Sequence, residues 1–427
     1  MILSTLTIVF VITLLIGVPI VFCLGISSLA ALLVMGDMPL QIIPQKIYNG
    51  MDSFPLLCIP FFILAGEFMG QGKITDRLLK FSILLVGRMR GGLALANVLA
   101  SMFFGGMTGS ALADTSALGS VEIPMMIKAG YGKRFSAAIT CASAIVGPLI
   151  PPSVVVIIYA LAVGGSIGAL FLAGVIPGIL VGLALMVGAY IISRKRNYPK
   201  REEKVSLKEL YYGFKKVFLA LMLPVIIVGG IISGLFTATE ASSIAVVYAF
   251  IVTVFIMKTI KFSQIPKLMV NSVIVTAIVM IILGTSTIFG WVITVEQVNV
   301  ILAKFLGFAG PIVFLLIINI FLLFLGAIMD IIPVILIFAP TLAPIAIGLG
   351  IHPLHFGMIV CLNCTIGLIT PPLGQVLFIG CSIADISLEA LSKEILVFLF
   401  IELAVLFLVT YVPFTTLWVP RLFGFIS

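Results

Sequence analysis

Charged side chains are scarce in this chain. Asp, Glu, Lys and Arg make up 9% of its 427 residues, and His352 and His355 are the only two histidines. The sequence also lacks an HExxH motif, a P-loop and a paired acidic motif, so it offers neither the zinc site of a metalloprotease nor the phosphate cradle of an ATPase. These absences exclude an ordinary soluble domain and argue against an enzyme or a pump driven directly by ATP.

Apolar residues dominate instead. They make up 62% of the chain, and the mean hydropathy is +1.34, which predicts an all-α polytopic membrane protein. The alternating segments of about ten residues that mark a membrane β-barrel are missing. The net charge of +8 does not indicate a nucleic-acid partner, because the basic residues lie in short connections between apolar runs, where they set the topology in the lipid bilayer.

The N-terminal third begins with an apolar stretch, residues 3–35, that is too long for one crossing. We expect two short helices bent near Gly17-Val18-Pro19; a single tilted helix is the alternative. The stretch lacks a charged leader and a cleavage site, so we interpret it as retained helix. A helix over 54–70 follows, and residues 73–90, with basic side chains among leucines, predict a segment lying along the membrane surface.

Residues 91–127 predict a re-entrant hairpin. They are apolar at both ends, Gly- and Ser-rich in the middle and flanked on both sides by basic residues, so both ends face the same side of the membrane. Asp114 follows the tip closely. An ionisable group in the membrane is a functional candidate, but Asp114 could equally cap the outgoing helix of the hairpin.

Two Pro-Pro pairs interrupt apolar runs at matching places. Pro151-Pro152 and Pro371-Pro372 lie 220 positions apart, each after a glycine in the pattern Gly-x-x-x-Pro-Pro. Proline removes a backbone donor and clashes with the preceding turn, so each pair breaks a helix. In hydrocarbon, the freed backbone groups are tolerated only where protein or a water-filled cavity satisfies them. Matched breaks in two halves of a chain are typical of the ion and substrate site of a secondary transporter.

The halves repeat with opposite orientation. The basic loop 128–134 has as its counterpart the loop 348–355, which contains no Lys or Arg, so the repeats are predicted to be inverted. A second re-entrant hairpin is therefore expected over 309–347, with Asp330 at its tip. Glu240, in Thr237-Ala238-Thr239-Glu240, is interpreted as part of a capping box. The predicted organisation is N-terminal scaffold helices (1–53), first repeat (54–193), basic cytoplasmic linker (194–216), central scaffold pair (217–267) and second repeat (268–427).

Each predicted break frees oxygen atoms. The carbonyls of 143–148 and 363–370 are hard ligands suited to Na⁺, and hydroxyls of Ser101, Ser143, Thr365 and Thr370 can supplement them. Asp330 interrupts an apolar run and is a candidate for contact with a cation or with substrate hydroxyls. Helix kinks formed only for packing are the plain alternative, but they do not account for two matched breaks that each accompany a Gly-rich hairpin.

At this point the chain resembles a known family, the large membrane subunit of tripartite ATP-independent periplasmic (TRAP) transporters. The resemblance covers essentially the whole length, and its likeness is closest to the sialic-acid type. Ala238 stands where the family has proline. The motifs that carry it are Gly105-Gly106-Met107-Thr108-Gly109-Ser110-Ala111-Leu112-Ala113-Asp114, Gly147-Pro148-Leu149-Ile150-Pro151-Pro152-Ser153, Phe236-Thr237-Ala238-Thr239-Glu240-Ala241, Gly326 with Met329-Asp330 and Pro333, and Gly367-Leu368-Ile369-Thr370-Pro371-Pro372-Leu373-Gly374.

The resemblance implies a Na⁺-driven importer of organic acid anions, sialic acid or C4-dicarboxylates, in a bacterial inner membrane. It implies an elevator motion of hairpins and broken helices against a scaffold. It also implies two partners, a small four-helix membrane subunit and a soluble periplasmic binding protein.

The resemblance also implies the site residues. The first Na⁺ site would use Ser101, Ser143, Val146 and Pro148, and the second Gly326, Thr365 and the stretch from Leu368 to Thr370. Substrate would lie between the hairpin tips, near Thr108, Gly109, Ser110 and Asp330.

Two other functions stay open. A channel would also use broken helices, but nothing in the sequence resembles a repeated selectivity filter. A carboxylate symporter that works with Na⁺ or H⁺ and without a binding protein would share all of the features described above. Uptake measurements distinguish these cases.

Overall fold

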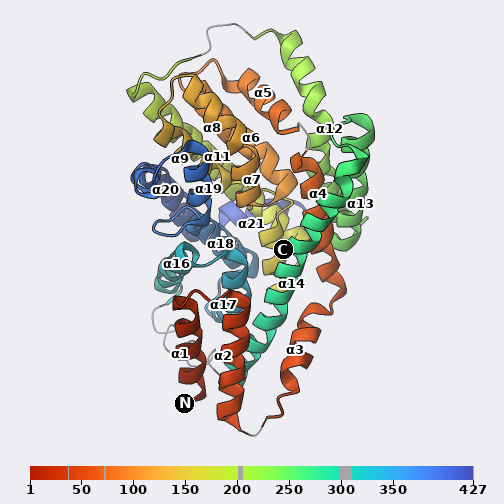
Figure 1. Cartoon of the computed structure of the whole chain (residues 1–427), viewed down its shortest axis with the longest axis vertical. Helices are drawn as coiled ribbons and strands as arrows, with labels where there is room; N and C mark the ends of the chain where they lie inside the picture. The colour runs from red at the N-terminus through yellow and green to blue at the C-terminus, as the bar shows by residue number, and fades with distance from the viewer. Residues whose placement is uncertain (37, 72–73, 201–204, 298–309, 427) are drawn as a thin grey trace.

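Helices make up every regular element in the described part of the chain (Figure 1). The computed structural model describes all residues except 37, 72–73, 201–204, 298–309 and 427. Seven of its helices are long and apolar enough to cross a membrane, or eight if the bent pair Ile42–Met51 and Phe54–Gly70 is one span. The all-α polytopic prediction is therefore confirmed.

The first part of the chain runs from the N-terminal helices to the end of the first predicted repeat. Its elements are α1 (Ile2–Leu15), α2 (Ile20–Met35), α3 (Ile42–Met51), η1 (Phe54–Leu57), α4 (Cys58–Gln71), α5 (Ile74–Val86), α6 (Gly92–Thr108), α7 (Ala111–Ala117), α8 (Gly119–Lys128), α9 (Lys133–Ala144), α10 (Val154–Val163) and α11 (Ile167–Lys195).

The second part shows a similar succession. Its elements are α12 (Leu207–Ile232), α13 (Ala238–Phe250), the π-helical η2 (Ile251–Ile256), η3 (Phe262–Gln264), α14 (Ile265–Val295), α16 (Gly310–Ile328), α17 (Ile331–Gly348), α18 (Pro353–Gly367), α19 (Gln375–Ala384), α20 (Leu388–Tyr411) and α21 (Phe414–Leu422).

The N-terminal stretch forms two helices rather than one. α1 and α2 pack side by side and run in opposite directions, red in Figure 1. The chain reverses between them at Gly17, whose φ of +84° is accessible to glycine at no steric cost, and Pro19 follows as the N-cap of α2. The prediction of two short helices is confirmed, and the single tilted helix is excluded.

Helices joined by a short turn lie where both hairpins were predicted, and both predicted breaks are present. The first hairpin consists of α6 followed by α7 and α8, and the second of α16 and α17. Helix α9 ends before the first Pro-Pro pair and α10 resumes after it; α18 and α19 flank the second pair in the same way. Both Pro-Pro bonds are cis. Helix α10 packs against α17, so the continuation of the first break contacts the outgoing helix of the second hairpin.

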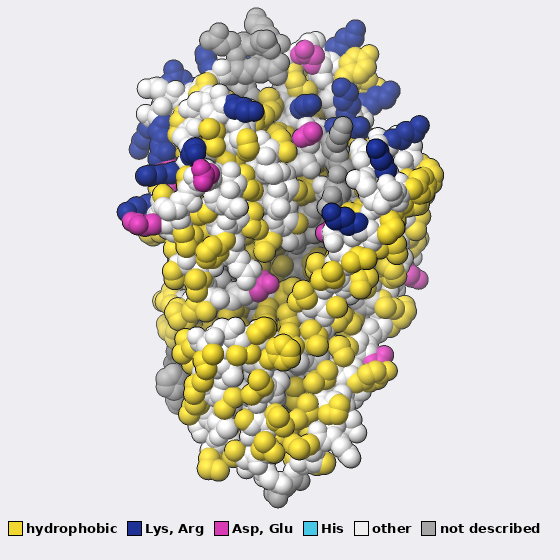
Figure 2. All heavy atoms as spheres, viewed as in Figure 1, with side chains coloured by type: hydrophobic (Ala, Val, Ile, Leu, Met, Phe, Trp, Pro, Cys, Tyr) yellow, Lys and Arg dark blue, Asp and Glu magenta, His cyan; other side chains and the backbone are white. Residues whose placement is uncertain are grey.

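The surface separates into an apolar body and a basic end. Exposed hydrophobic side chains cover most of the face in Figure 2, and Lys and Arg gather at the end drawn uppermost. That end carries α5, α8 and the start of α12 in Figure 1. A large apolar surface is expected for a protein that lies in lipid, and the positive-inside rule predicts that the basic end faces the cytoplasm.

One boundary differs from the sequence-based expectation. The helix predicted from 217 begins at Leu207, so part of the predicted linker is helical. Ser206 accounts for the difference, since it forms a capping box with Glu209 and starts the helix inside the charged stretch. The capping box predicted at Glu240 is confirmed: its carboxylate accepts from the Thr237 amide at 2.8 Å.

Candidate functional site

The first hairpin meets the first helix break through glycines. A Cβ on Gly147 would lie 3.3 Å from the Gly105 Cα, and a Cβ on Gly105 would overlap the Gly147 backbone. Contact at this distance requires both residues to lack side chains. The close approach brings the oxygen atoms of the break against helix α6.

Four buried polar side chains join α6 to α9 just before the break. The Ser101 and Ser143 hydroxyls lie 3.0 Å apart, and Ser143 donates to Asn97 Oδ1 at 2.8 Å. The Asn97 amide in turn donates to the Thr140 hydroxyl at 2.7 Å. All four side chains are at most 1% exposed. The structure thus brings together the two predicted hydroxyl ligands, Ser101 and Ser143.

The carbonyl oxygens of the first break accept hydrogen bonds from groups a few residues further along the chain. Val146 O accepts from the Leu149 and Ile150 amides at 3.1 and 3.2 Å, and Pro148 O accepts from the Ser153 hydroxyl. Ser153 also caps α10 by accepting from the Val156 amide. A carbonyl oxygen has two lone pairs. The Val146 carbonyl oxygen already accepts two hydrogen bonds, so a cation there would have to replace one of the two amides. The Pro148 carbonyl oxygen accepts one and keeps one lone pair free.

The second half repeats the glycine contact. A Cβ on Gly326 would lie 3.0 Å from the Gly367 Cα and 3.2 Å from the Cys364 carbonyl oxygen. Beside it, Asn363 donates to both the backbone and the side-chain oxygen of Asn319 at 2.9 Å. The Asn319 amide donates to the Thr410 hydroxyl at 3.0 Å.

Apart from Gly326 on α16, the predicted residues of the second cation site lie on the last turn of α18 and in the break that follows. The Thr365 hydroxyl donates to Cys361 O at 2.5 Å, and the Thr370 hydroxyl donates to Ile366 O at 3.0 Å. Leu368 O accepts from the Val376 amide at 3.3 Å, across the break. Thr365 and Leu368 are buried, whereas Thr370 is half-buried.

Oxygen atoms without partners provide a test of whether a cation fits. Within the described residues, the Asn363 Oδ1 atom and both Asp114 carboxylate oxygens are buried and accept no hydrogen bond. Buried polar groups are normally paired. Hydroxyl, amide and carbonyl oxygens are the hard ligands that a small cation prefers, so the residues at both breaks fit Na⁺.

Asp114 does not cap the outgoing helix. Ser110 is the N-cap of α7 and accepts from the Ala113 amide. Asp114 is fully buried, with Oδ2 3.7 Å from the position of a Cβ on Gly147. Neither oxygen of its carboxylate has a hydrogen-bond partner among the described residues. The carboxylate therefore faces the first break.

The predicted substrate residues occupy the two hairpin tips. Gly109 has a φ of +61°, and a Cβ there would lie 2.9 Å from the Val154 amide nitrogen. The first tip therefore packs tightly against the residues of the first break. Thr108 is buried and Ser110 half-buried. At the second tip, Asp330 is half-buried and caps α17 by accepting from the Ile331 amide at 2.6 Å.

Sequence reasoning missed several buried polar residues. Asn97 and Asn319 link each hairpin to the adjacent broken helix, and each is a lone amide in an otherwise apolar run; their 222-position separation, near the repeat offset, is the signal that could have found them. Glu122 and Glu402 are also fully buried, and their carboxylates have no hydrogen-bond partner among the described residues.

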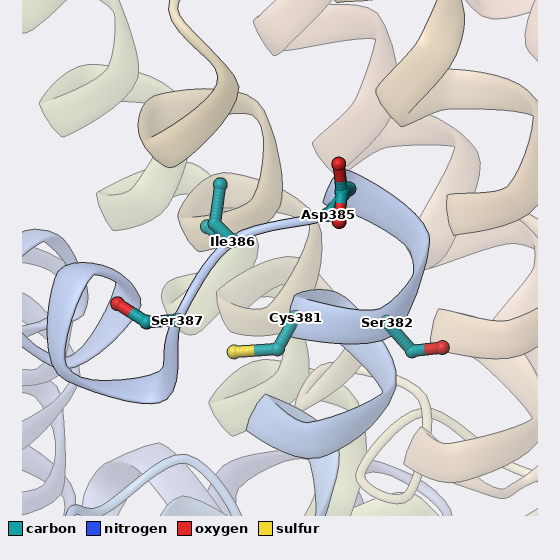
Figure 3. A pocket seen from close by; sticks show the side chains of 5 residues that line it. All are labelled: Cys381, Ser382, Asp385, Ile386 and Ser387. Carbon is teal, nitrogen blue, oxygen red and sulfur yellow. The ribbon is translucent and has the colours of Figure 1, made fainter.

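A hollow of about 540 Å³ lies away from these residues, between α19 and α20 (Figure 3). It is lined by Cys381, Ser382, Asp385, Ile386 and Ser387. Asp385 lies 4.0 Å from Lys133, and both side chains are exposed. None of the predicted site residues lines this hollow.

The chain matches a known family over most of its length. Residues 7–415 match the family described as tripartite ATP-independent periplasmic transporter, DctM component. The sialic acid TRAP transporter large permease protein SiaM of Vibrio cholerae is 41% identical, covering 95% of this chain and 96% of that protein. The C4-dicarboxylate large permease DctM of Pseudomonas aeruginosa is 41% identical over 94% of each chain.

One relative is longer than this chain. The isethionate TRAP transporter permease protein DctMQ of Oleidesulfovibrio alaskensis is 39% identical, covering 95% of this chain and 64% of that protein. Among solved structures, the Alcanivorax borkumensis YdaH transporter has a TM-score of 0.61 at 14% identity, covering 99% of this chain and 98% of its own. At that identity the likeness concerns the fold.

Proposed function

We propose that this chain, which belongs to the DctM family of tripartite ATP-independent periplasmic transporters, couples Na⁺ entry to the import of a small organic acid anion. Members of this family are multi-pass membrane permeases and not enzymes. The observation that carries the proposal is the pair of helix breaks, each held against a hairpin by a glycine–glycine contact and each beside buried hydroxyl and amide oxygens.

We place one cation at each break. The first site is formed by Ser101, Ser143, Val146 and Pro148, and the second by Gly326, Thr365, Leu368 and Thr370. The C-terminal ends of α9 and α18 point into the breaks, and the negative end of a helix dipole favours a cation there. Hydrogen bonds that hold Ser101 to Ser143 keep two of the oxygens in place.

The substrate anion binds between the hairpin tips in this proposal. Thr108, Gly109 and Ser110 supply hydroxyl and amide groups from the first tip, and Asp330 supplies a carboxylate from the second. A carboxylate repels an anion, so the role of Asp330 is to accept from substrate hydroxyls. Polyhydroxylated sialic acid suits this arrangement, and the names of the relatives leave C4-dicarboxylates as the second class.

Transport proceeds by an elevator motion of two inverted repeats in this proposal. The matched order of hairpin and broken helix in each half supports it, as does the absence of Lys and Arg from loop 348–355. The moving body would contain both hairpins and both broken helices, and the first hairpin already contacts the first break at Gly109.

Two partners complete the proposed transporter in a bacterial inner membrane. A small four-helix membrane subunit is supported by the relative named DctMQ, which extends well beyond this chain. A periplasmic binding protein that delivers the anion is supported by the family description.

Uptake into proteoliposomes tests the proposal. The chain, its small subunit and the binding protein are reconstituted, and labelled sialic acid or succinate is supplied with an inward gradient of Na⁺ or of K⁺. We expect saturable uptake only with Na⁺. Asp330→Asn should weaken it while the protein still folds, because an amide oxygen is a weaker acceptor than a carboxylate, and asparagine also caps helices well.

Other results of the uptake experiment would indicate a different function. Equal uptake in Na⁺ and K⁺ would contradict Na⁺ coupling. Na⁺-driven uptake without the binding protein would identify a carboxylate symporter that works alone. Unsaturable currents through the reconstituted chain would indicate a channel.

A further inference from the structure

A basic hollow lies at the cytoplasmic end of the molecule, away from both helix breaks. Its volume is about 540 Å³, and six residues line it: Arg88, Met89, Arg90, Tyr190, Arg194 and Lys200. Four of the six carry a positive charge and none carries a negative one. The volume is in the range of small-molecule sites.

These cations lack acidic partners in the described part of the chain. The ion pairs found there join Lys133 to Asp385, Arg196 to Glu394 and Lys393 to Glu389, and none includes a lining residue. Arg90 donates only to the neutral Asn197 side chain, at 3.2 Å. Four like charges around one hollow repel one another, so an anion bound among them would be strongly favoured.

Backbone contacts join the segments that form the hollow. The Gly91 amide donates to Pro199 O at 3.3 Å, which joins the α5–α6 turn to the segment that follows α11. Gly91 has a φ of +73°, and any side chain there would overlap Ser193 of α11. Gly91 is also the N-cap of α6 and provides no side chain, so the positive end of that 17-residue helix begins beside Arg90.

We propose that this hollow binds the phosphate of an anionic phospholipid headgroup. Arginine pairs with phosphate through two parallel hydrogen bonds, and the hollow presents three arginines. Tyr190 and the exposed Met89 suit the boundary between headgroups and acyl chains, and helix α5 beside them buries an apolar face. Basic residues next to a membrane are attracted to anionic lipid of the cytoplasmic leaflet.

The bound headgroup would hold three elements together. The turn after α5, the start of α6 and the end of α11 each contribute to the hollow or its wall. Helix α6 is the incoming helix of the first hairpin, so the bound lipid would hold the start of that hairpin in place. The inference needs only the membrane placement of the chain and does not depend on which ion drives transport.

Native mass spectrometry of the purified chain in neutral detergent tests this inference. The probes are phosphatidylglycerol and phosphatidylcholine with the same acyl chains. We expect phosphatidylglycerol to bind more tightly, and the double variant Arg88→Gln/Arg194→Gln to weaken its binding by about tenfold or more, because each basic residue near the surface contributes attraction. Arg88→Lys/Arg194→Lys keeps the charge and should lose less.

A matched control removes the same charge elsewhere. Lys215→Gln/Lys216→Gln changes two exposed residues of α12 and should leave phosphatidylglycerol binding unchanged. Equal weakening by both glutamine double variants would mean general attraction to the basic end and would overturn the site. Full displacement of the lipid by millimolar inorganic phosphate would assign the hollow to a soluble phosphate compound instead. Equal binding of the two lipids would also overturn the proposal.

Discussion

Ser143 connects more of the candidate site than any other single residue described here. Its hydroxyl donates to Asn97 and lies 3.0 Å from the Ser101 hydroxyl, and the residue belongs to the last turn of α9, just before the first break. The Asn97 amide continues the chain of hydrogen bonds to Thr140. Removing one member of such a network leaves its buried partners unpaired, which costs more than the lost bond itself.

Replacing Ser143 with alanine should weaken Na⁺ binding while the protein still inserts. The Na⁺ concentration for half-maximal uptake is expected to rise about tenfold, equivalent to ~1.4 kcal/mol, because one ligand is lost and Ser101 is no longer held in place. The measurement is the Na⁺ dependence of initial uptake rates in proteoliposomes.

Ser272→Ala is the control for this change. Ser272 is 4% exposed, and its hydroxyl donates only to Leu268 of its own helix, so removing it should leave the Na⁺ dependence unchanged. An unchanged Na⁺ dependence in Ser143→Ala would remove Ser143 from the proposed site.

Among the elements, the hairpins and broken helices contact each other at two equivalent glycine pairs, Gly105 with Gly147 and Gly326 with Gly367. Each pair lets backbone meet backbone, which places the oxygen atoms of the break beside the hairpin. Larger residues at these positions would separate the two elements.

Gly326→Ala should destabilise the protein. The new Cβ would lie 3.0 Å from the Gly367 Cα and 3.2 Å from the Cys364 oxygen, both backbone atoms that cannot rotate away. Overpacking of this kind costs about 1–3 kcal/mol. The expected result is a lower melting temperature and weaker Na⁺ stabilisation, measured by thermal unfolding in detergent.

Gly290→Ala is the matched control. Gly290 lies within α14, and a Cβ there meets nothing within 4 Å. Alanine is favoured over glycine in a helix by about 0.5–1 kcal/mol, so this variant should melt at or above the wild-type temperature. Similar melting of the two variants would show that the contact between the hairpin and the break is not tight.

The sequence predicted the elements better than it predicted the contacts between them. Pro-Pro pairs, Gly-rich tips and the turn at Gly17 and Pro19 act through local backbone rules, so the breaks, both hairpins and the N-terminal helix pair were predictable. The start of α12 was predicted too late because the charges of the segment outweighed the capping signal of Ser206 and Glu209.

Contacts between residues that are distant in the sequence were harder to predict than the helices themselves. Ser101 and Ser143 were predicted together, but Asn97 and Asn319 were not, since a single asparagine in an apolar run carries no sign of what it will contact. Their hydrogen bonds depend on how α6 packs on α9 and how α16 packs on α18, which only the folded chain determines. The buried carboxylate of Asp114 was noticed from sequence, but its direction toward Gly147 was not.

For the molecule as a whole, the arrangement separates three tasks. An apolar surface suits the chain to lipid, the basic end is predicted to set its orientation, and the two breaks hold polar oxygen atoms in a largely apolar interior. Buried polar oxygens without partners destabilise a protein unless a ligand uses them. The central claim is that Na⁺ binds the folded chain at both breaks, beside the unpartnered oxygen atoms of Asp114 and Asn363.

The melting temperature of the purified chain tests this claim most directly. It is measured while NaCl replaces choline chloride at constant ionic strength. Na⁺ that binds only the folded state stabilises it by mass action, by about 2.7 kcal/mol per site at a hundred times the dissociation constant. The account predicts a saturable rise in melting temperature with Na⁺ that K⁺ does not reproduce. Identical melting in Na⁺, K⁺ and choline would contradict cation sites at the helix breaks.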